Sequence, residues 1–514
     1  MTGASDQPPE RFNMAAYAIG RAAAARPQHP ALLVMADPDG DPAETWTFAS
    51  LEDAVLRIAS ALQALGLKPG TRILIRLENT SAYALLFFGA IAGGFVPLPT
   101  SAQLTEHEAQ FLLDDSGAEA IALGHDLGLR KVPAGVHVFD AEAIARMLRE
   151  GPRAQYADTA ADDPAFLIYT SGTTALPKGV LHAQRSSFGR RPMYQGWYGI
   201  GATDRMLHAG AFNWTFTLGT GLTDPWANGA TSIIYTGEKD PALWPRLIAR
   251  TGATLFAGVP GVYRQILKYA SPNRDDLGAL RHGLMAGEAP PPGLFEEWTA
   301  RTGRPLYEAL GMSEISTYVS SGPDVPRKPG AVGKAQPGRR LAVLPLDSGN
   351  DPLPAGEEGL LAVHRSDPGL MLGYWRPQEE CEVYRGDWFV GGDIAVIDRE
   401  GYVFHLGRAN DLMKALGYRI SPLEVEAAIS EHPSVAEVAC AEVKVRADIS
   451  VIAAFVVPNA GIMADAADIE RFAAERLAAY KRPRSIVFVE SLPRTANGKI
   501  MRQALRLPAD FSTG

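Results

Sequence analysis

The sequence has only two cysteines among its 514 residues, Cys381 and Cys440, and it lacks any block of basic residues. Two cysteines cannot form a disulfide framework or a cysteine-rich metal cluster, which indicates a reducing compartment. The formal net charge of −9 argues against nucleic acid as a partner. We therefore expect a cytoplasmic protein that does not bind nucleic acid.

Long apolar runs are also absent. Residues 1–13 are polar and contain no apolar signal core. The longest apolar run, residues 84–99, contains three glycines, ends in prolines and is short for a membrane span. We expect a buried helix that leads into a strand, and no membrane span.

Helix and strand signals alternate along most of the chain. Residues 47–67 predict a capped amphipathic helix, residues 72–77 a strand, and a second helix begins at Ala82. Further strand-like runs are centred on Ile121, residues 136–139, Leu167, Ile233, Leu255 and Leu284. Such alternation predicts a layered α/β fold with largely parallel sheets.

The pattern changes after Gly338. Short strand-like runs at 342–345, 359–363, 393–398 and 402–406, separated by Gly, Pro and Asp, predict a small β subdomain. The chain beyond it suits a small α+β domain with two helices, one capped by Ser421 and one over 467–480, and three strands, at 435–445, 451–457 and 485–489. Because 514 residues exceed one core, we expect a large multi-sheet α/β N-terminal domain, residues 1–409, and a C-terminal domain, residues 410–514.

Residues 169–180, Tyr-Thr-Ser-Gly-Thr-Thr-Ala-Leu-Pro-Lys-Gly-Val, have the composition of an anion-binding loop. They follow an apolar run, residues 165–169, that predicts a buried strand. The composition argues against a regular helix or strand here, while glycines let backbone N–H groups turn inward and hydroxyls and Lys178 add donors. The lysine precedes the second glycine, so this is not the Walker A pattern. Alone, the stretch fits an ordinary polar loop equally well.

This stretch resembles the phosphate loop of the adenylate-forming superfamily, which includes acyl-CoA synthetases, nonribosomal-peptide adenylation domains and luciferases. The family pattern is Thr-Ser-Gly-Thr-Thr-Gly-x-Pro-Lys-Gly, from which this chain departs at Ala175. The resemblance runs from about Thr47 to Arg502. It implies that ATP phosphates are bound by Thr170, Ser171, Gly172, Thr173, Thr174 and Lys178.

Residues 307–314, Tyr-Glu-Ala-Leu-Gly-Met-Ser-Glu, resemble the family segment that closes over adenine and ends in a magnesium-binding glutamate. A carboxylate fits there, since Mg²⁺ that bridges phosphates takes only one or two protein carboxylates. The implied metal ligand is Glu314, and Leu310 replaces the usual aromatic residue, which predicts weaker adenine stacking. The other residues implied to border the nucleotide are Gly311, Met312, Ser313, Gly287, Glu288 and Ala289.

Asp393 and Arg408 match the family's ribose-binding and phosphate-binding positions. A carboxylate can accept hydrogen bonds from both ribose hydroxyls, and a guanidinium supplies donors of fixed charge. Asn410 stands where the family has a hinge aspartate, and it tolerates the left-handed conformation that a hinge can require.

The C-terminal segment, residues 492–500, matches the family's catalytic segment, with Lys499 as the lysine. Such a cation stabilises negative charge as it develops in the transition state. Gly417 and Tyr418 lie in a stretch that resembles the loop lining the coenzyme A tunnel.

The resemblance implies a two-step ligase. A carboxylate first attacks the α-phosphorus of Mg-ATP, which gives an acyl-adenylate and pyrophosphate. The mobile C-terminal domain then turns about Asn410, and a thiol takes the acyl group with release of AMP. Mg²⁺ is the implied cofactor, with ATP and coenzyme A as co-substrates.

The acceptor and the acid are less closely defined. Because no carrier domain follows Lys499, free coenzyme A is favoured; the alternative is a stand-alone adenylation enzyme that loads a separate carrier protein. A non-catalytic ATP sensor is expected to lack Lys499 or Glu314, and nothing supports a luciferase-type oxidase.

The family's acyl pocket is bordered here by mostly apolar residues, Phe212, Asn213, Trp214 and Phe216, although Phe216 is equally well explained as core. Gly311 indicates room for an aromatic, branched or medium-length acid. A homodimer is left open.

Overall fold

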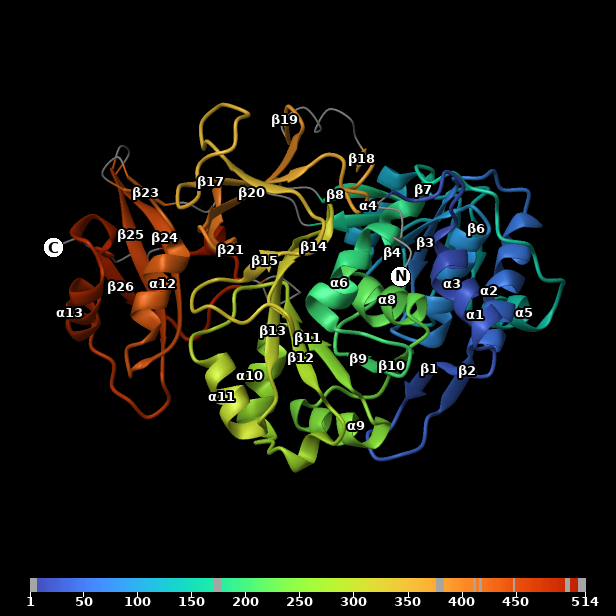
Figure 1. Cartoon of the computed structure of the whole chain (residues 1–514), viewed down its shortest axis with the longest axis horizontal. Helices are drawn as coiled ribbons and strands as arrows, with labels where there is room; N and C mark the ends of the chain where they lie inside the picture. The colour runs from blue at the N-terminus through green and yellow to red at the C-terminus, as the bar shows by residue number, and fades with distance from the viewer. Residues whose placement is uncertain are drawn as a thin grey trace. The chain divides into compact units, whose positions relative to one another are not determined.

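The structure of the protein is a computed structural model that describes residues 7–170, 177–375, 383–409, 413–415, 418–446, 449–494 and 500–506 (Figure 1). The chain divides into two compact units. The first comprises Met1–Gly287, Phe295–Leu341 and Val363–Phe389, and the second comprises Glu288–Leu294, Ala342–Ala362 and Val390–Gly514. The expected boundary at residues 409 and 410 falls inside the second unit and stays a prediction.

The first unit contains a parallel sheet of four strands in the order β4-β3-β5-β6. These strands are β3 Arg72–Arg76, β4 Val96–Pro99, β5 Ala120–Leu123 and β6 His137–Phe139. The accompanying helices are α2 Phe48–Gln63, α3 Ser81–Ala92, α4 Glu106–Ser116 and α5 Ala141–Arg149. Thr47 caps α2 by accepting a hydrogen bond from the Ser50 N–H, as expected for a capped helix. The apolar run 84–99 forms the buried part of α3 and then β4, which confirms the sequence-based expectation.

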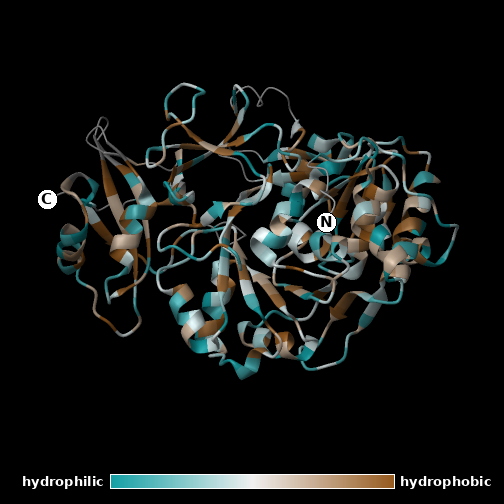
Figure 2. Ribbon diagram, in the orientation of Figure 1, coloured by the Kyte–Doolittle hydropathy of each residue, from teal (hydrophilic) through white to brown (hydrophobic). Residues whose placement is uncertain are grey.

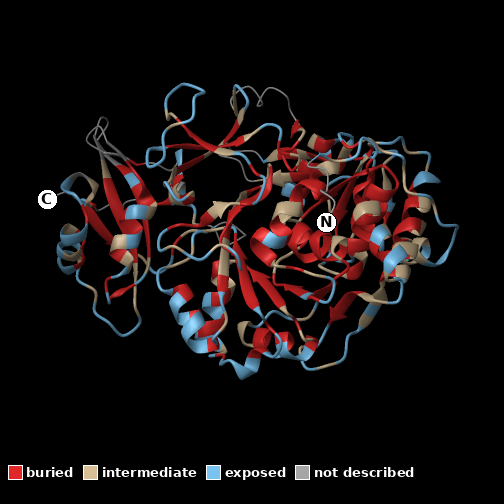
Figure 3. Cartoon of the chain, viewed as in Figure 1, coloured by how far each residue is buried: buried red, intermediate tan, exposed pale blue. Residues whose placement is uncertain are grey.

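A second, larger sheet of the first unit has the strand order β15-β14-β13-β12-β11-β9-β10-β1-β2. The strands are β1 Pro30–Met35, β2 Glu44–Thr47, β9 Arg205–His208, β10 Thr231–Tyr235, β11 Leu255–Gly258, β12 His282–Ala286, β13 Leu306–Met312, β14 Ser316–Ser320 and β15 Gly333–Ala335. The pairs from β1 to β13 are parallel, and β2, β14 and β15 pair antiparallel. Strands β10, β11 and β12 are buried (Figure 3) and largely apolar (Figure 2), as parallel strands covered on both faces require.

Several helices accompany this larger sheet along the chain. They are α9 Trp244–Thr251, α10 Pro260–Tyr269 and α11 Leu294–Thr302. In parallel α/β sheets the carboxyl ends of the strands are the usual place for ligands. We therefore expect ligands to bind at the carboxyl ends of β9, β11, β12 and β13.

A small antiparallel sheet carries the arms of the predicted phosphate loop. Its order is β18-β8-β7, with β7 Pro164–Thr170, β8 Lys178–Ala183 and β18 Gly373–Tyr374. The expected buried strand at 165–169 is confirmed, but the expectation that residues 169–180 avoid regular structure is wrong at both ends. Thr170 pairs with Lys178, and Tyr169 with Gly179. Antiparallel pairing of the two arms satisfies their backbone groups, and this outweighs the irregular composition.

The second unit contains most of the small β subdomain and a compact C-terminal α+β fold. The first of these is formed from β16 Leu341–Leu344, β17 Glu358–His364, β20 Trp388–Ile397 and β21 Tyr402–Arg408. The C-terminal fold has a sheet in the order β24-β25-β26, a hairpin of β22 and β23, and two helices. Its elements are β22 Met413–Ala415, β23 Tyr418–Ile420, α12 Pro422–Ser430, β24 Val435–Arg446, β25 Ile449–Pro458, α13 Ala466–Arg476 and β26 Ser485–Phe488.

In this fold the sequence predicted the start of α12 correctly but not the end of α13. Ser421 caps α12, as predicted, by accepting from the Glu424 N–H. The expectation that the second helix reaches residue 480 is wrong, because α13 ends at Arg476 and Leu477 is extended. The Arg482 guanidinium donates to the carbonyls of Leu477 and Ala474, and so satisfies backbone acceptors at the helix end. Among the described residues, no helix is long and apolar enough to cross a membrane.

Gly189 should be intolerant of any side chain. It lies in a 3-10 turn, Gln184–Arg190, and a Cβ there would stand 2.1 Å from the Gly369 backbone nitrogen. We predict that Gly189→Ala lowers the free energy of unfolding by about 1–3 kcal/mol, because backbone must move to admit the methyl group. Gly201→Ala is the matched control, since its Cβ would meet nothing closer than 4.0 Å. Equal free energies of unfolding for the two variants, measured by denaturant titration, would contradict the close approach of Gly189 to the Gly369 backbone.

Candidate active site

Glu314 lies in the turn between β13 and β14 and meets the edge of the small sheet. The Tyr374 hydroxyl donates to Glu314 Oε1 at 2.8 Å, and the Met371 N–H donates to the Glu314 carbonyl at 2.8 Å. The Lys178 Nζ lies 5.6 Å from the centroid of the Tyr374 ring. The structure thus brings together two predicted residues, Glu314 and Lys178, around a tyrosine that the sequence did not indicate. Tyr374 is 60 residues from Glu314, and no local pattern marks it.

His182, on β8, supports the same turn from the buried side. Its Nε2 lies 2.8 Å from the Ser313 carbonyl oxygen, and its ring stacks on Phe166 with centroids 4.5 Å apart. Burial lowers the pKa of His182 to about 4, so the ring is neutral near pH 7. A carbonyl can only accept, which places the ring proton on Nε2. Sequence reasoning missed this residue, since a lone histidine in a strand carries no signal.

Gly311 is required by the approach of β14. The register of the β13–β14 pair shifts between Leu310 and Gly311, and a Cβ on Gly311 would lie 2.6 Å from the Ser316 carbonyl oxygen. The glycine therefore has a structural reason that is independent of any bound acid. The absence of a side chain here does not by itself argue for a roomy acyl pocket.

Other residues expected to border the nucleotide fall in different places. Met312 is buried at the end of β13, and Gly287 follows β12 with a φ of +107°, a conformation that favours glycine. Glu288 and Ala289 belong to the second unit.

Asp393 and Arg408 are neighbours in the second unit. They are cross-strand partners on β20 and β21, and Arg408 Nε lies 3.2 Å from Asp393 Oδ1. His405 Nε2 lies 3.0 Å from the same carboxylate oxygen. The paired spacing in the sequence therefore reflects a strand register, and the two side chains form an ion pair.

Phe216 lies beside two aromatic side chains near the carboxyl end of β9. Its ring centroid is 4.5 Å from that of His208 and 5.9 Å from that of Trp197. Burial lowers the pKa of His208 to about 3, and its Nδ1 accepts a hydrogen bond from the Gly210 N–H. This cluster of Trp197, His208 and Phe216 is uncharged near pH 7. Neither His208 nor Trp197 was expected from the sequence.

Phe212 is 1% exposed and packs against Tyr83, while Asn213 and Trp214 are partly exposed. The assignment of these three residues to an acyl pocket stays a prediction. Several predicted residues lie outside the described part of the chain: Ser171, Gly172, Thr173, Thr174, Asn410, Gly417 and Lys499. Tyr418 is the first residue of β23.

Comparison with known proteins covers nearly the whole chain. Residues 19–375 match the model of the AMP-binding enzyme family, and residues 424–499 match that of the AMP-binding enzyme C-terminal domain. The chain is 32% identical to the benzoate–CoA ligase of Thauera aromatica, over 97% of this chain and 96% of that protein. It is 28% identical to the 3-hydroxybenzoate–CoA ligase of Aromatoleum sp. (strain CIB), over 90% and 92% of the two chains. The solved benzoate CoA ligase from Burkholderia xenovorans LB400 superposes with a TM-score of 0.84 at 29% identity, covering 96% of this chain and 99% of that one.

The chain belongs to the AMP-binding enzyme family of adenylate-forming enzymes. It is an AMP-forming acid–thiol ligase of the acyl-CoA synthetase type, which uses a carboxylic acid, ATP and coenzyme A. These findings confirm the resemblance and the α/β fold class, and they favour coenzyme A over a carrier protein as the acceptor.

The lowered pKa of His182 predicts a specific dependence of stability on pH. In the unfolded chain the pKa is about 6.5, so between pH 6.5 and 4 the unfolded state binds more protons than the folded state. Stability should therefore fall as the pH drops through this window, by about 3 kcal/mol for this one group.

His182→Gln keeps an N–H donor for the Ser313 carbonyl and cannot be protonated. We predict that the free energy of unfolding of this variant, measured by urea titration from pH 7 to pH 4.5, falls less steeply than that of the wild type. His208 and His282, whose pKa values burial also lowers, are present in both proteins and cancel. Parallel pH profiles would show that His182 is not buried as a neutral ring.

Proposed function

We propose that this enzyme activates an aromatic monocarboxylic acid of the benzoate class and transfers the aroyl group to coenzyme A. The observation that carries the proposal is the uncharged cluster of Trp197, His208 and Phe216 near the carboxyl end of β9. Trp197 and His208 are buried, and Phe216 is the half-buried member of the cluster. A flat apolar ligand in contact with Phe216 would gain energy beyond its buried area, as stacked or edge-on rings do. Relatives named for benzoate and 3-hydroxybenzoate, and a solved anthranilate CoA ligase at 26% identity and a TM-score of 0.86, support the same class.

A second ionised group on the acid would need a fixed counter-charge, because an unpaired charge away from water is costly. His208 is neutral near pH 7, because burial and the nearby Lys239 ammonium lower its pKa to about 3. Lys239, whose Nζ donates to the Ala209 carbonyl at 3.3 Å, is a cation close to this cluster, so a dicarboxylate belongs in the panel of acids that tests the proposal.

We further propose that Glu314 is the protein ligand of Mg²⁺. Its Oε1 accepts the Tyr374 hydrogen bond, and its Oε2 accepts none among the described residues. No group of three or more His, Cys, Asp or Glu side chains suited to a metal occurs in the part of the chain that is described. One carboxylate fits Mg²⁺, which otherwise keeps waters and substrate phosphates as ligands. When bound, the ion would neutralise phosphate charge.

The remaining assignments concern ATP and coenzyme A. We assign Lys178 and the loop from Thr170 to the phosphates, Asp393 and Arg408 to the ribose, and Lys499 to the charge that develops at the α-phosphate. In the first step a carboxylate oxygen of the acid bonds to the α-phosphorus, and the bond to pyrophosphate breaks. In the second the thiol sulfur bonds to the acyl carbon, and AMP leaves. The protein's part is positioning and electrostatic stabilisation.

Between these steps we propose that residues 410–514 turn about Asn410, which brings the face of Gly417 and Tyr418 to the adenylate. Such rotation about a few residues is a known mode of domain switching. A cytoplasmic location and a homodimer stay predictions.

Tyr374→Phe tests the role of the hydroxyl on Glu314. We predict that adenylation, measured by pyrophosphate release, falls about 10-fold, because removal of a hydrogen bond that orients a metal ligand typically costs this much or more. Thioester formation from pre-made aroyl-adenylate should be unchanged. The matched control is Tyr156→Phe, which removes another tyrosine–glutamate hydrogen bond, 3.1 Å long, to Glu52. Equal loss of both half-reactions would contradict the assignment.

The proposed substrate class is tested with a panel of acids. AMP release is measured with benzoate, 3-hydroxybenzoate, anthranilate, hexanoate and malonate, each with and without coenzyme A. We expect the best aromatic acid to exceed hexanoate in kcat/KM by at least about 10-fold, with malonate inactive. Aroyl-CoA should form in step with AMP. A preference for hexanoate or malonate would overturn the aromatic assignment.

A further inference from the structure

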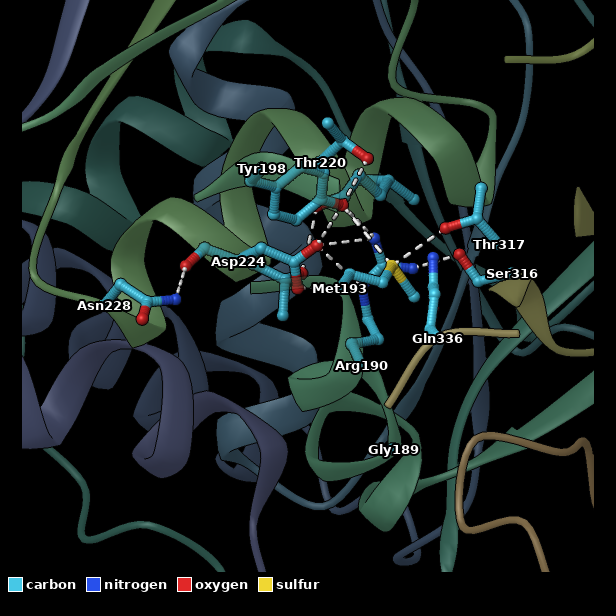
Figure 4. Close-up of polar contacts among 12 residues, drawn as sticks. Gly189, Arg190, Met193, Tyr198, Thr220, Asp224, Asn228, Ser316, Thr317 and Gln336 are labelled. Atoms are coloured by element: carbon cyan, nitrogen blue, oxygen red, sulfur yellow. Dashed lines mark hydrogen bonds and ion pairs between the residues drawn. The ribbon is translucent and has the colours of Figure 1, made fainter. Parts of the chain in front are cut away.

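Arg190 and Asp224 form a buried ion pair in the first unit (Figure 4). Their side chains are 8% and 0% exposed. Arg190 Nε donates to Asp224 Oδ1 at 2.8 Å, and Nη2 donates to Oδ2 at 2.6 Å. The Tyr198 hydroxyl adds a third hydrogen bond to Oδ2, at 2.8 Å. Burial opposes the charge on Arg190, but Asp224 outweighs it and raises the pKa of the guanidinium, which therefore stays charged.

The surrounding backbone is shaped to admit this guanidinium. A Cβ on Gly219 would lie 2.1 Å from Arg190 Cζ, so only glycine leaves room for it. Gly219 begins a π-helical turn, Gly219–Thr223, and Tyr198 ends another, Tyr194–Tyr198. Such π-helical turns are rare in proteins overall, and those that occur are often found at functional sites. A buried ion pair is also weak evidence for stability, because desolvation offsets most of the attraction.

The remaining guanidinium nitrogen of Arg190, Nη1, contacts the residue that follows the turn carrying Glu314. Arg190 Nη1 donates to Ser316 Oγ. Ser316 has a φ of +72°, one of two non-glycine residues in the described chain with a positive φ. This conformation costs a residue with a Cβ about 1–2 kcal/mol, so something must hold it. Ser316 follows Glu314 by two positions, and its backbone lies against Gly311.

We propose that Arg190, itself fixed by Asp224, is a positioning residue for the metal ligand. Its hydrogen bond to Ser316, the first residue of β14, holds that residue in its left-handed conformation, and the preceding turn in that form orients the Glu314 carboxylate toward the metal and the ATP phosphates. The inference rests on the proposed metal role of Glu314 and adds a buried cation that acts on it through Ser316. At the start of the same turn, His182 holds the Ser313 carbonyl.

Two substitutions at Ser316 separate conformation from packing. Ser316→Ala removes the hydroxyl that Arg190 holds and keeps the Cβ that makes a positive φ unfavourable. Ser316→Gly also removes the hydroxyl, but glycine adopts a positive φ readily. If Arg190 acts by holding this conformation, Ser316→Ala should lower the affinity for the metal ion more than Ser316→Gly does, although alanine is the smaller chemical change.

The measured quantity is the affinity for Mn²⁺ in the presence of a non-hydrolysable ATP analogue, followed by electron paramagnetic resonance. We expect Ser316→Ala to weaken Mn²⁺ binding by about 5- to 30-fold, the factor to which the cost of an unsupported positive φ corresponds. Ser316→Gly should lie closer to the wild type than to the alanine variant.

Ser320→Ala, in the same strand, is the control. It removes a buried serine whose hydroxyl donates to the Gly196 carbonyl at 3.0 Å, and Ser320 has no positive φ. It should leave Mn²⁺ affinity unchanged. The proposal is overturned if Ser316→Ala binds Mn²⁺ as tightly as Ser320→Ala, or if Ser316→Gly is as weak as Ser316→Ala. If Glu314→Gln leaves Mn²⁺ affinity at the wild-type value, the metal role of Glu314 fails instead.

Discussion

The hydrogen bonds that hold residues 313–316, the turn between β13 and β14 together with the first residue of β14, are the constraint on which the rest of the site depends. His182 donates to the Ser313 carbonyl, the Met371 N–H donates to the Glu314 carbonyl, and Arg190 donates to the Ser316 hydroxyl. Each donor comes from a different segment of the chain. The turn can therefore carry a non-glycine residue with a positive φ and still present Glu314 in one orientation.

Two of these donors are both buried, but one is neutral and the other carries a positive charge. His182 is neutral because burial disfavours its charged form and the Arg190 and Arg185 cations oppose that form further. Arg190 stays charged because Asp224 lies within hydrogen-bonding distance. A neutral ring can satisfy a carbonyl without placing a second cation behind Glu314. The charge of Arg190 is balanced locally by Asp224, so it can orient Ser316 without attracting the Glu314 carboxylate away from a metal. In this way the core supports the site mechanically and adds little net charge to it.

Much of the fold could be predicted from the sequence, because its signals are local. Short sequence segments were enough to predict the Thr47 cap of α2, the apolar run that forms α3 and β4, and the start of α12 at Ser421. The boundaries that failed depend on distant partners. Lys178 and Gly179 belong to a strand because they pair with β7. Helix α13 ends earlier than predicted, at a point where the Arg482 guanidinium donates hydrogen bonds to the carbonyls of Ala474 and Leu477.

The motifs singled out Glu314 and Lys178, and the structure brings both beside Tyr374; their roles stay predictions. Tyr374, His182 and Arg190 were missed for one physical reason. Each acts through a contact with a segment at least 60 residues away, and none stands in a pattern of its own. Gly311 shows the converse: its motif suggested a pocket, while the structure shows that the approach of β14 already demands a glycine.

The proposed placement of Glu314 on the metal that accompanies ATP is tested most directly by a crystal structure with Mn²⁺ and a non-hydrolysable ATP analogue, in which anomalous scattering locates the ion. We expect a Mn²⁺ ion in direct coordination with one Glu314 carboxylate oxygen, with the remaining ligands from phosphates and water. An ion held on the phosphates with the Glu314 carboxylate turned away from it would contradict the metal role of Glu314.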